Sequence, residues 1–164
     1  LELGYGSGIM MPALSKIGRK VYGIDLNSDP VKTGANLRKI GINVTLVKAD
    51  MLDKSFPDES FDLVVAISIF EHIPNARAVS ETVYKCLKPN GLFLVGMPGV
   101  NKFMQAAFSA IGFGGINDHH ITSHSQFLKA SEDLFKVERS AKIPHWMPFS
   151  GGLYFNTLLS KRQR

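Results

Sequence analysis

The first eight residues, Leu-Glu-Leu-Gly-Tyr-Gly-Ser-Gly, constrain the fold of this chain more than any other segment. An acidic residue is followed by glycines at three alternate positions, Gly4, Gly6 and Gly8. The pattern predicts a strand that runs directly into a tight turn, because glycine accepts unusual backbone conformations and leaves a ligand free to approach the main chain. Only three residues precede the turn, whereas a strand usually needs about five. We therefore expect the chain to enter its fold partway along the first strand.

The composition is that of one globular domain of 164 residues, with 45% hydrophobic and 20% charged residues. No apolar run approaches the roughly 20 residues that a membrane span requires. The single cysteine, Cys86, excludes an internal disulfide and a cysteine-rich metal site, and it favours a cytoplasmic location. The sequence does not predict an oligomeric state.

The net charge of +5 is mildly basic, and part of it lies in a C-terminal tail that contains Lys161, Arg162 and Arg164. The other positive charges are dispersed, and no RNA- or DNA-binding motif accompanies them. We therefore expect a solvated surface and no nucleic-acid partner.

Strand and helix patterns alternate along the chain, which favours a parallel sheet with helices on both faces. Expected strands cover residues 21–24, 44–48, 61–68, 92–97, 135–142 and 154–160, and helices cover 9–17, a segment between Asp29-Pro30 and Gly41, a segment that begins near Asn75, and 125–131. The last two strands are expected to form an antiparallel pair at one edge. The prediction is an α/β fold with a Rossmann-like, doubly wound sheet of seven strands.

We divide the single domain into three parts, a cofactor-binding core at 1–98, a variable acceptor-side or lid segment at 99–133, and a terminal strand pair at 134–164. Residues Lys102–Ile111 carry an apolar stripe that is either core or a lid over a hydrophobic acceptor, with the following glycines as its hinge.

The glycine turn differs from a dinucleotide fingerprint, since Ile9 stands where a third small residue is needed. It also lacks a Walker lysine and any nearby arginine that would anchor a phosphate. Carboxylates lie at the expected strand ends instead. Asp25 ends the second strand and can accept from ribose hydroxyls, Asp50 ends the third and can accept from an adenine amino group, and Glu2 lies just before the turn. These residues favour a positively charged nucleoside such as S-adenosylmethionine, although Asp53 competes with Asp50 for its role.

Five segments together resemble class I S-adenosylmethionine-dependent methyltransferases, most closely the small-molecule branch that includes quinone and sterol enzymes. They are Glu2-Leu-Gly-Tyr-Gly-Ser-Gly8, Val21-Tyr-Gly-Ile-Asp25, Lys48-Ala-Asp50-Met51, Phe56-Pro-Asp-Glu-Ser-Phe-Asp62-Leu-Val-Val65 and Leu87-Lys-Pro-Asn-Gly-Leu92. The resemblance implies a helix before the first strand that covers the cofactor, and it implies that the glycine turn and Ala66–Ser68 surround the methionine portion. The expected cofactor-binding residues are Glu2, Gly4, Tyr5, Gly6, Gly8, Asp25, Leu26, Asp50, Met51, Ala66, Ile67 and Ser68.

Tyr5 and the histidines leave alternatives open. Tyr5 replaces a residue that is usually small in this family, so it either crowds the turn or closes over the ligand. His72 follows the fourth strand and is either a general base or a structural residue of the loop. His119, His120 and His124 lack a convincing metal-ligand spacing, because Thr122-Ser123 predicts a helix start between them, so we expect no metal.

The function expected from this resemblance is transfer of the methyl group of S-adenosylmethionine to a small-molecule or lipid-like acceptor, with S-adenosylhomocysteine as product. A noncatalytic domain that binds S-adenosylmethionine is the alternative, because the sequence shows no obligatory catalytic residue. A nucleotide-dependent oxidoreductase is disfavoured by the glycine spacing.

Overall fold

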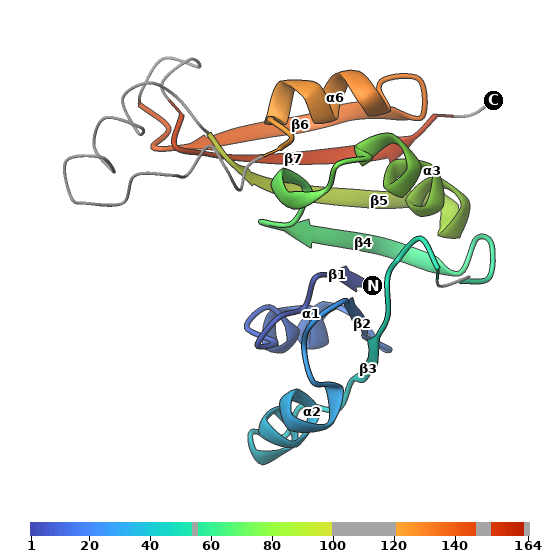
Figure 1. The fold of residues 1–164 in the computed structure, drawn as a ribbon, viewed down its shortest axis with the longest axis vertical. Helices are drawn as coiled ribbons and strands as arrows, with labels where there is room; N and C mark the ends of the chain where they lie inside the picture. The colour runs from blue at the N-terminus through green and yellow to red at the C-terminus, as the bar shows by residue number, and fades with distance from the viewer. Residues whose placement is uncertain (54–55, 100–120, 147–151, 163–164) are drawn as a thin grey trace.

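The structure is a computed structural model that describes residues 1–53, 56–99, 121–146 and 152–162 (Figure 1). Seven strands form one sheet in the order β3-β2-β1-β4-β5-β7-β6. The strands are β1 (Glu2–Leu3), β2 (Tyr22–Asp25), β3 (Thr45–Lys48), β4 (Phe61–Ile67), β5 (Leu87–Pro98), β6 (Phe135–Ile143) and β7 (Tyr154–Lys161). The helices are α1 (Met11–Ile17), α2 (Pro30–Lys39), α3 (Ala76–Cys86) and α6 (His124–Ser131), with a short 3-10 helix η1 (Phe70–His72).

The pairing of the strands confirms the expected sheet. Neighbours from β3 to β5 pair in parallel, and β7 runs antiparallel to both β5 and β6. Because β7 is inserted between β5 and β6, its first residue lies beside the carboxyl end of β5, where Tyr154 pairs with Pro98. The carboxyl ends of the parallel strands and the start of β7 therefore share one edge of the sheet.

The sheet separates two apolar layers, as a doubly wound fold requires. Successive residues of β4 alternate between them, since Val64 and Ala66 belong to one cluster and Val65 to the other. The first layer includes Val79 and Val83 of α3 and Phe127 of α6, and the second includes Met11 and Leu14 of α1 and Leu37 of α2. In Figure 1, α3 and α6 lie beside β4 to β7, and α1 and α2 lie beside β1 to β3.

Local capping explains where the helices begin. The Asp29 carboxylate accepts from the amides of Val31 and Lys32, and Pro30 occupies the first turn of α2, as the sequence predicted. Helix α6 begins one residue earlier than predicted, because Ser123 forms a reciprocal capping box with Gln126. Helix α1 begins at Met11 rather than at residue 9, because the glycine turn continues through the exposed Ile9.

The prediction of a strand confined to residues 92–97 was wrong at its start. Strand β5 begins at the buried Leu87, which pairs with Phe61, and the pairing then jumps so that Leu92 lies opposite Leu63. Residues 89–91, which precede the predicted strand, are therefore an irregularity inside β5. Its extra residues loop out of the register while both flanking leucines stay paired with β4.

No helix of the described residues is long and apolar enough to cross a membrane. The apolar stripe of Lys102–Ile111, together with His119 and His120, lies outside the residues that the structure describes.

Candidate functional site

The three glycines of the turn all adopt left-handed backbone conformations, with φ angles of +68° at Gly4, +52° at Gly6 and +81° at Gly8. A Cβ atom at Gly4 would lie 2.5 Å from Ile69 Cδ1, and one at Gly8 would lie 3.1 Å from side-chain atoms of α2. A Cβ atom at Gly6 would meet no atom within 4 Å. A side chain at Gly4 or Gly8 would thus press on neighbouring side chains, whereas Gly6 leaves the turn open on the side that a ligand can approach.

Asp25 lies directly beside this turn. One carboxylate oxygen accepts from the Gly6 amide at 2.8 Å, and the other accepts from the amides of Asn27 and Ser28, each at 2.8 Å. Burial acts to raise the pKa of Asp25, but the three backbone hydrogen bonds outweigh it and hold the pKa below its ordinary value. The carboxylate is therefore ionised and fixed in orientation at neutral pH.

Glu2 is a buried acid at the base of the turn, and its side chain is only 3% exposed. Its Oε2 atom has no hydrogen-bond partner among the described residues. Burial raises the pKa of Glu2 to about 7, and the charge of Asp25 acts in the same direction. A buried carboxyl oxygen without a partner is costly unless a charged or hydrogen-bonding group faces it, so this atom is a candidate to bind such a group of a ligand.

The residues after β3 lie next to Asp25, because β2 and β3 pair in parallel up to Asp25 and Lys48. Asp50 is partly exposed and accepts from the Leu52 amide at 2.8 Å. Met51 packs against the apolar layer that contains Phe61, and the Leu26 side chain is 57% exposed beside Asp25. Asp53 is exposed on the same turn. These positions can present an apolar surface and a carboxylate to a planar ring.

The end of β4 completes this edge of the sheet. Ala66 pairs with Leu3, so residues 66–68 lie beside the glycine turn. Ser68 adopts a left-handed conformation with φ of +53°, which is uncommon for a residue other than glycine. Its amide donates to the Gly96 carbonyl at 2.8 Å, and its side chain is exposed.

The sequence left two positions open for the Tyr5 ring, crowding the turn or closing over the ligand, and the structure shows neither. Its side chain is 2% exposed and packs with Met11 in the apolar layer of α1, and a Cβ atom at Gly23 would lie 2.9 Å from its ring. Its hydroxyl donates to the Ser28 carbonyl at 3.3 Å. The ring neither crowds the turn nor closes over a ligand, because the absence of a side chain at Gly23 leaves it a place in the core, and only its backbone faces the site.

The short helix η1 carries the candidate base and a residue that the sequence analysis missed. His72 is exposed, and its amide donates to the Ile69 carbonyl at 3.0 Å. Glu71 is 3% exposed, and its Oε2 atom has no hydrogen-bond partner in the described part of the chain. Burial raises the pKa of Glu71 above its ordinary value. The adjacent acid and histidine were the available signal, but the sequence alone did not show which of the two side chains is buried.

His124 is a core residue. Its Nε2 atom lies 2.9 Å from Thr157 Oγ1, and its ring stacks on Phe155 with the centroids 4.8 Å apart. Burial lowers its pKa. Within the described ranges no group of three or more metal-ligating side chains is present.

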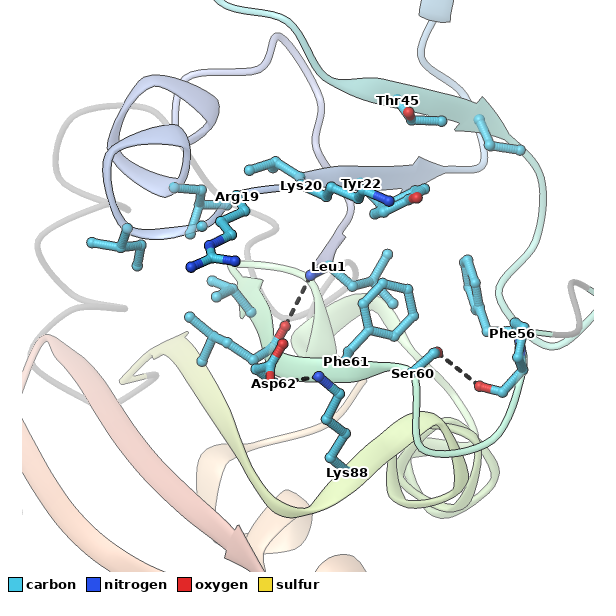
Figure 2. A pocket seen from close by; sticks show the side chains of 18 residues that line it. Leu1, Arg19, Lys20, Tyr22, Thr45, Phe56, Ser60, Phe61, Asp62 and Lys88 are labelled. Atoms are coloured by element: carbon cyan, nitrogen blue, oxygen red, sulfur yellow. Dashed lines mark hydrogen bonds and ion pairs between the residues drawn. The ribbon is translucent and has the colours of Figure 1, made fainter.

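A cavity of about 960 Å³ opens at the opposite edge of the sheet (Figure 2). It lies at the amino ends of β2 and β4, where Leu1, Tyr22 and Phe61 line it. At its rim Lys88 pairs with Asp62 at 2.7 Å. The glycine turn, Asp25, Asp50 and Ser68 are not part of its wall. We place the functional site at the carboxyl edge, because open α/β sheets bind ligands there and because the carboxylates lie there.

Comparison with known proteins agrees with this geometry. Residues 1–95 match a family described as a methyltransferase domain. The ubiquinone biosynthesis O-methyltransferase of Pseudomonas fluorescens is 33% identical over 96% of this chain and 68% of its own length. The sterol 24-C-methyltransferase of Yarrowia lipolytica is 33% identical over 57% of this chain and 26% of its own length.

A solved structure shows the same fold at low sequence identity. It is the geranyl diphosphate C-methyltransferase of Streptomyces coelicolor, in complex with Mg²⁺, geranyl diphosphate and S-adenosyl-L-homocysteine. The TM-score is 0.76 at 14% identity, with 98% of this chain and 70% of that chain covered.

The fold and the site define a class I methyltransferase that uses S-adenosylmethionine. The chain belongs to the methyltransferase family that its first 95 residues match. It is an enzyme of the small-molecule branch, and the comparisons give no support to the noncatalytic alternative.

Proposed function

We propose that this enzyme methylates an oxygen atom of a small, hydroxyl-bearing acceptor in the cytoplasm. The observation that carries the cofactor site is the buried Oε2 atom of Glu2, which has no hydrogen-bond partner among the described residues, near the fixed carboxylate of Asp25. The choice of oxygen is supported by the similarity to an O-methyltransferase over 96% of this chain and 68% of that protein. The buried free Cys86 is consistent with a reducing compartment.

The residues present fit S-adenosylmethionine, which supplies an activated methyl group on a sulfonium when it is bound. Glu2 would accept from the ammonium, Asp25 from the ribose hydroxyls, and Asp50 from the adenine amino group. Leu26 and Met51 would cover the adenine, and the turn at Gly4, Gly6 and Gly8 would lie along the methionine portion. Ala66, Ile67 and Ser68 would line the methyl end.

The protein's main task is then to align the acceptor and exclude water, since the methyl group needs no further activation. Where the acceptor must lose a proton, we propose His72 as the base, because it is exposed on η1 directly after the methyl end. We keep the assignment of residues 1–98 to the cofactor, 99–133 to the acceptor side and 134–164 to the terminal strand pair.

The cofactor assignment is tested by isothermal titration of S-adenosylmethionine, S-adenosylhomocysteine and NAD. We expect a heat of binding with S-adenosylmethionine and with S-adenosylhomocysteine, and none with NAD. Asp25→Ala is expected to weaken their binding by about 1–3 kcal/mol through lost charged hydrogen bonds. Asp62→Ala is the matched control, because this exposed carboxylate lies at the opposite edge of the sheet. Equal affinity in both variants would refute the ribose assignment.

Catalysis is tested with S-adenosylmethionine that carries a labelled methyl group. Probe acceptors are phenol and benzoate, which present oxygen, benzylamine, which presents nitrogen, and thiophenol, which presents sulfur, each attached to a benzene ring. We expect transfer to phenol. Transfer only to the amine or the thiol would contradict the oxygen assignment, and transfer to none of the four probes would contradict the proposed class of acceptor.

A further inference from the structure

Tyr154 is brought to the site by the antiparallel insertion of β7. It is the first residue of that strand and pairs with Pro98, so it lies at the carboxyl edge of the sheet with the glycine turn. No sequence signal pointed to it, since it belongs to the terminal strand pair and is 86 positions from Ser68.

The Tyr154 side chain reaches across β5 toward the end of β4. A Cβ atom at Gly96 of β5 would lie 2.8 Å from the Tyr154 hydroxyl, so the glycine provides the space that the ring needs. The hydroxyl lies 2.8 Å from Ser68 Oγ. The Tyr154 hydroxyl therefore contacts Ser68, one of the residues that line the proposed methyl end.

Two further features mark this place as more than a packing contact. Ser68 keeps its left-handed conformation in an exposed position, and such strain is concentrated at functional sites. Glu71, whose Oε2 atom has no partner in the described residues, lies close enough for its charge to act on Tyr154. Burial first, and Glu71 in addition, raise the pKa of Tyr154 against the opposing bond from Ser68, so the phenol remains a proton donor at neutral pH.

We infer that the Tyr154 hydroxyl, held by Ser68, donates a hydrogen bond to the acceptor and positions its oxygen at the methyl end of the site. The inference rests on the proposed function and names a binding residue for it. A protonated phenol can donate to an oxygen lone pair, but it forms no such bond with a methyl or methylene group. The arrangement therefore favours acceptors that present a hydroxyl, phenolate or carboxylate oxygen over purely apolar ones.

The test measures binding rather than turnover, with protein loaded with S-adenosylhomocysteine. Phenol and toluene are titrated in parallel and followed by NMR, since the two probes differ mainly in one oxygen. We expect the wild type to bind phenol about fivefold to tenfold more tightly than toluene, the usual net effect of one hydrogen bond. Tyr154→Phe should bind both probes equally, with unchanged affinity for S-adenosylhomocysteine.

Tyr84→Phe is the matched control, because it also loses a hydroxyl hydrogen bond, to the Arg162 carbonyl, but on α3. It should keep the phenol preference. Ser68→Ala keeps the Tyr154 hydroxyl but removes the hydroxyl that fixes its position, so this variant should keep part of the phenol preference. It also provides a test if Tyr154→Phe does not fold.

Three results would overturn the inference. The first is a wild type that binds phenol and toluene equally, and the second is a Tyr154→Phe variant that still prefers phenol. The third is a Ser68→Ala variant that keeps the full phenol preference, while Ser68→Ala and Tyr154→Phe lower the unfolding temperature by the same amount. The last result would show that the hydrogen bond between Ser68 and Tyr154 only stabilises the fold. Failure of the proposed function is separate, since it would appear as no binding of S-adenosylhomocysteine or no methyl transfer.

Discussion

At the scale of single residues, Gly6 and Gly41 form a natural pair for comparison. Both have positive φ angles, +52° and +77°, and a Cβ atom at either position would meet nothing within 4 Å. They differ in surroundings, since Gly6 lies in the turn beside Asp25 and Gly41 follows α2. The pair can therefore separate the backbone cost of a side chain from its effect on a ligand.

We expect Gly6→Ala and Gly41→Ala each to lower the free energy of unfolding by about 1–2 kcal/mol, the cost of a left-handed conformation for alanine. Gly6→Ala alone should also weaken S-adenosylmethionine binding by about tenfold or more, because its methyl group would occupy the open side of the turn. Urea unfolding and isothermal titration measure the two effects. Equal cofactor affinity in both variants would show that the ligand does not approach Gly6.

At the scale of elements, α6 connects the terminal strand pair to the main core. Phe127 of this helix is fully buried, and its ring centroid lies 4.6 Å from that of Phe70 and 6.1 Å from that of Phe93. The helix has only eight residues, so its start contributes a large share of its stability. Ser123 supplies that start through the capping box.

Ser123→Ala is therefore expected to lower the free energy of unfolding by about 1 kcal/mol, the usual loss for an N-cap hydroxyl. Ser125→Ala is the control on the same helix, since Ser125 is exposed and makes a hydroxyl contact only with Ser123 among the bonds that the structure shows. Urea unfolding of the two variants gives the comparison. A loss of equal size in Ser125→Ala would mean that the box does not determine the stability of the helix start.

At the scale of the whole molecule, His124 ties the α6 layer to the sheet through Thr157, which is completely buried. Burial lowers the pKa of His124, so the folded state favours the neutral ring. A group with a lowered folded-state pKa binds its proton more readily in the unfolded state. Its contribution to stability is complete above the unfolded value of 6.5 and is lost as the pH falls below it.

We expect His124→Gln to be less stable than the wild type at pH 8, and the difference to shrink as the pH falls from 7 to 5. The difference between the two proteins isolates His124, because Glu2 and Glu71, whose raised pKa values act in the opposite sense, are present in both. Urea unfolding across this range measures it. A gap that stays constant with pH would show that His124 does not titrate differently in the folded and unfolded states.

Sequence reasoning succeeded where structure depends on neighbouring residues. The cap at Asp29, the three positive-φ glycines and the buried strand β4 follow from local backbone chemistry and hydrophobic pattern, and the structure confirms them. It failed where the position of a side chain or the start of a strand depends on residues that are distant in the sequence. The ring of Tyr5 is placed by the space at Gly23, and the start of β5 by pairing of Leu87 with Phe61.

The sequence by itself determined the alternating elements, the glycine turn and the carboxylates at the strand ends, because each depends on residues close together in the chain. Only the tertiary structure decided which side chains meet across the sheet. Ser68 and Tyr154 are neighbours because β7 inserts between β5 and β6, and Gly96 leaves room for the contact. Strand order is a long-range property, so local periodicity carries no record of it.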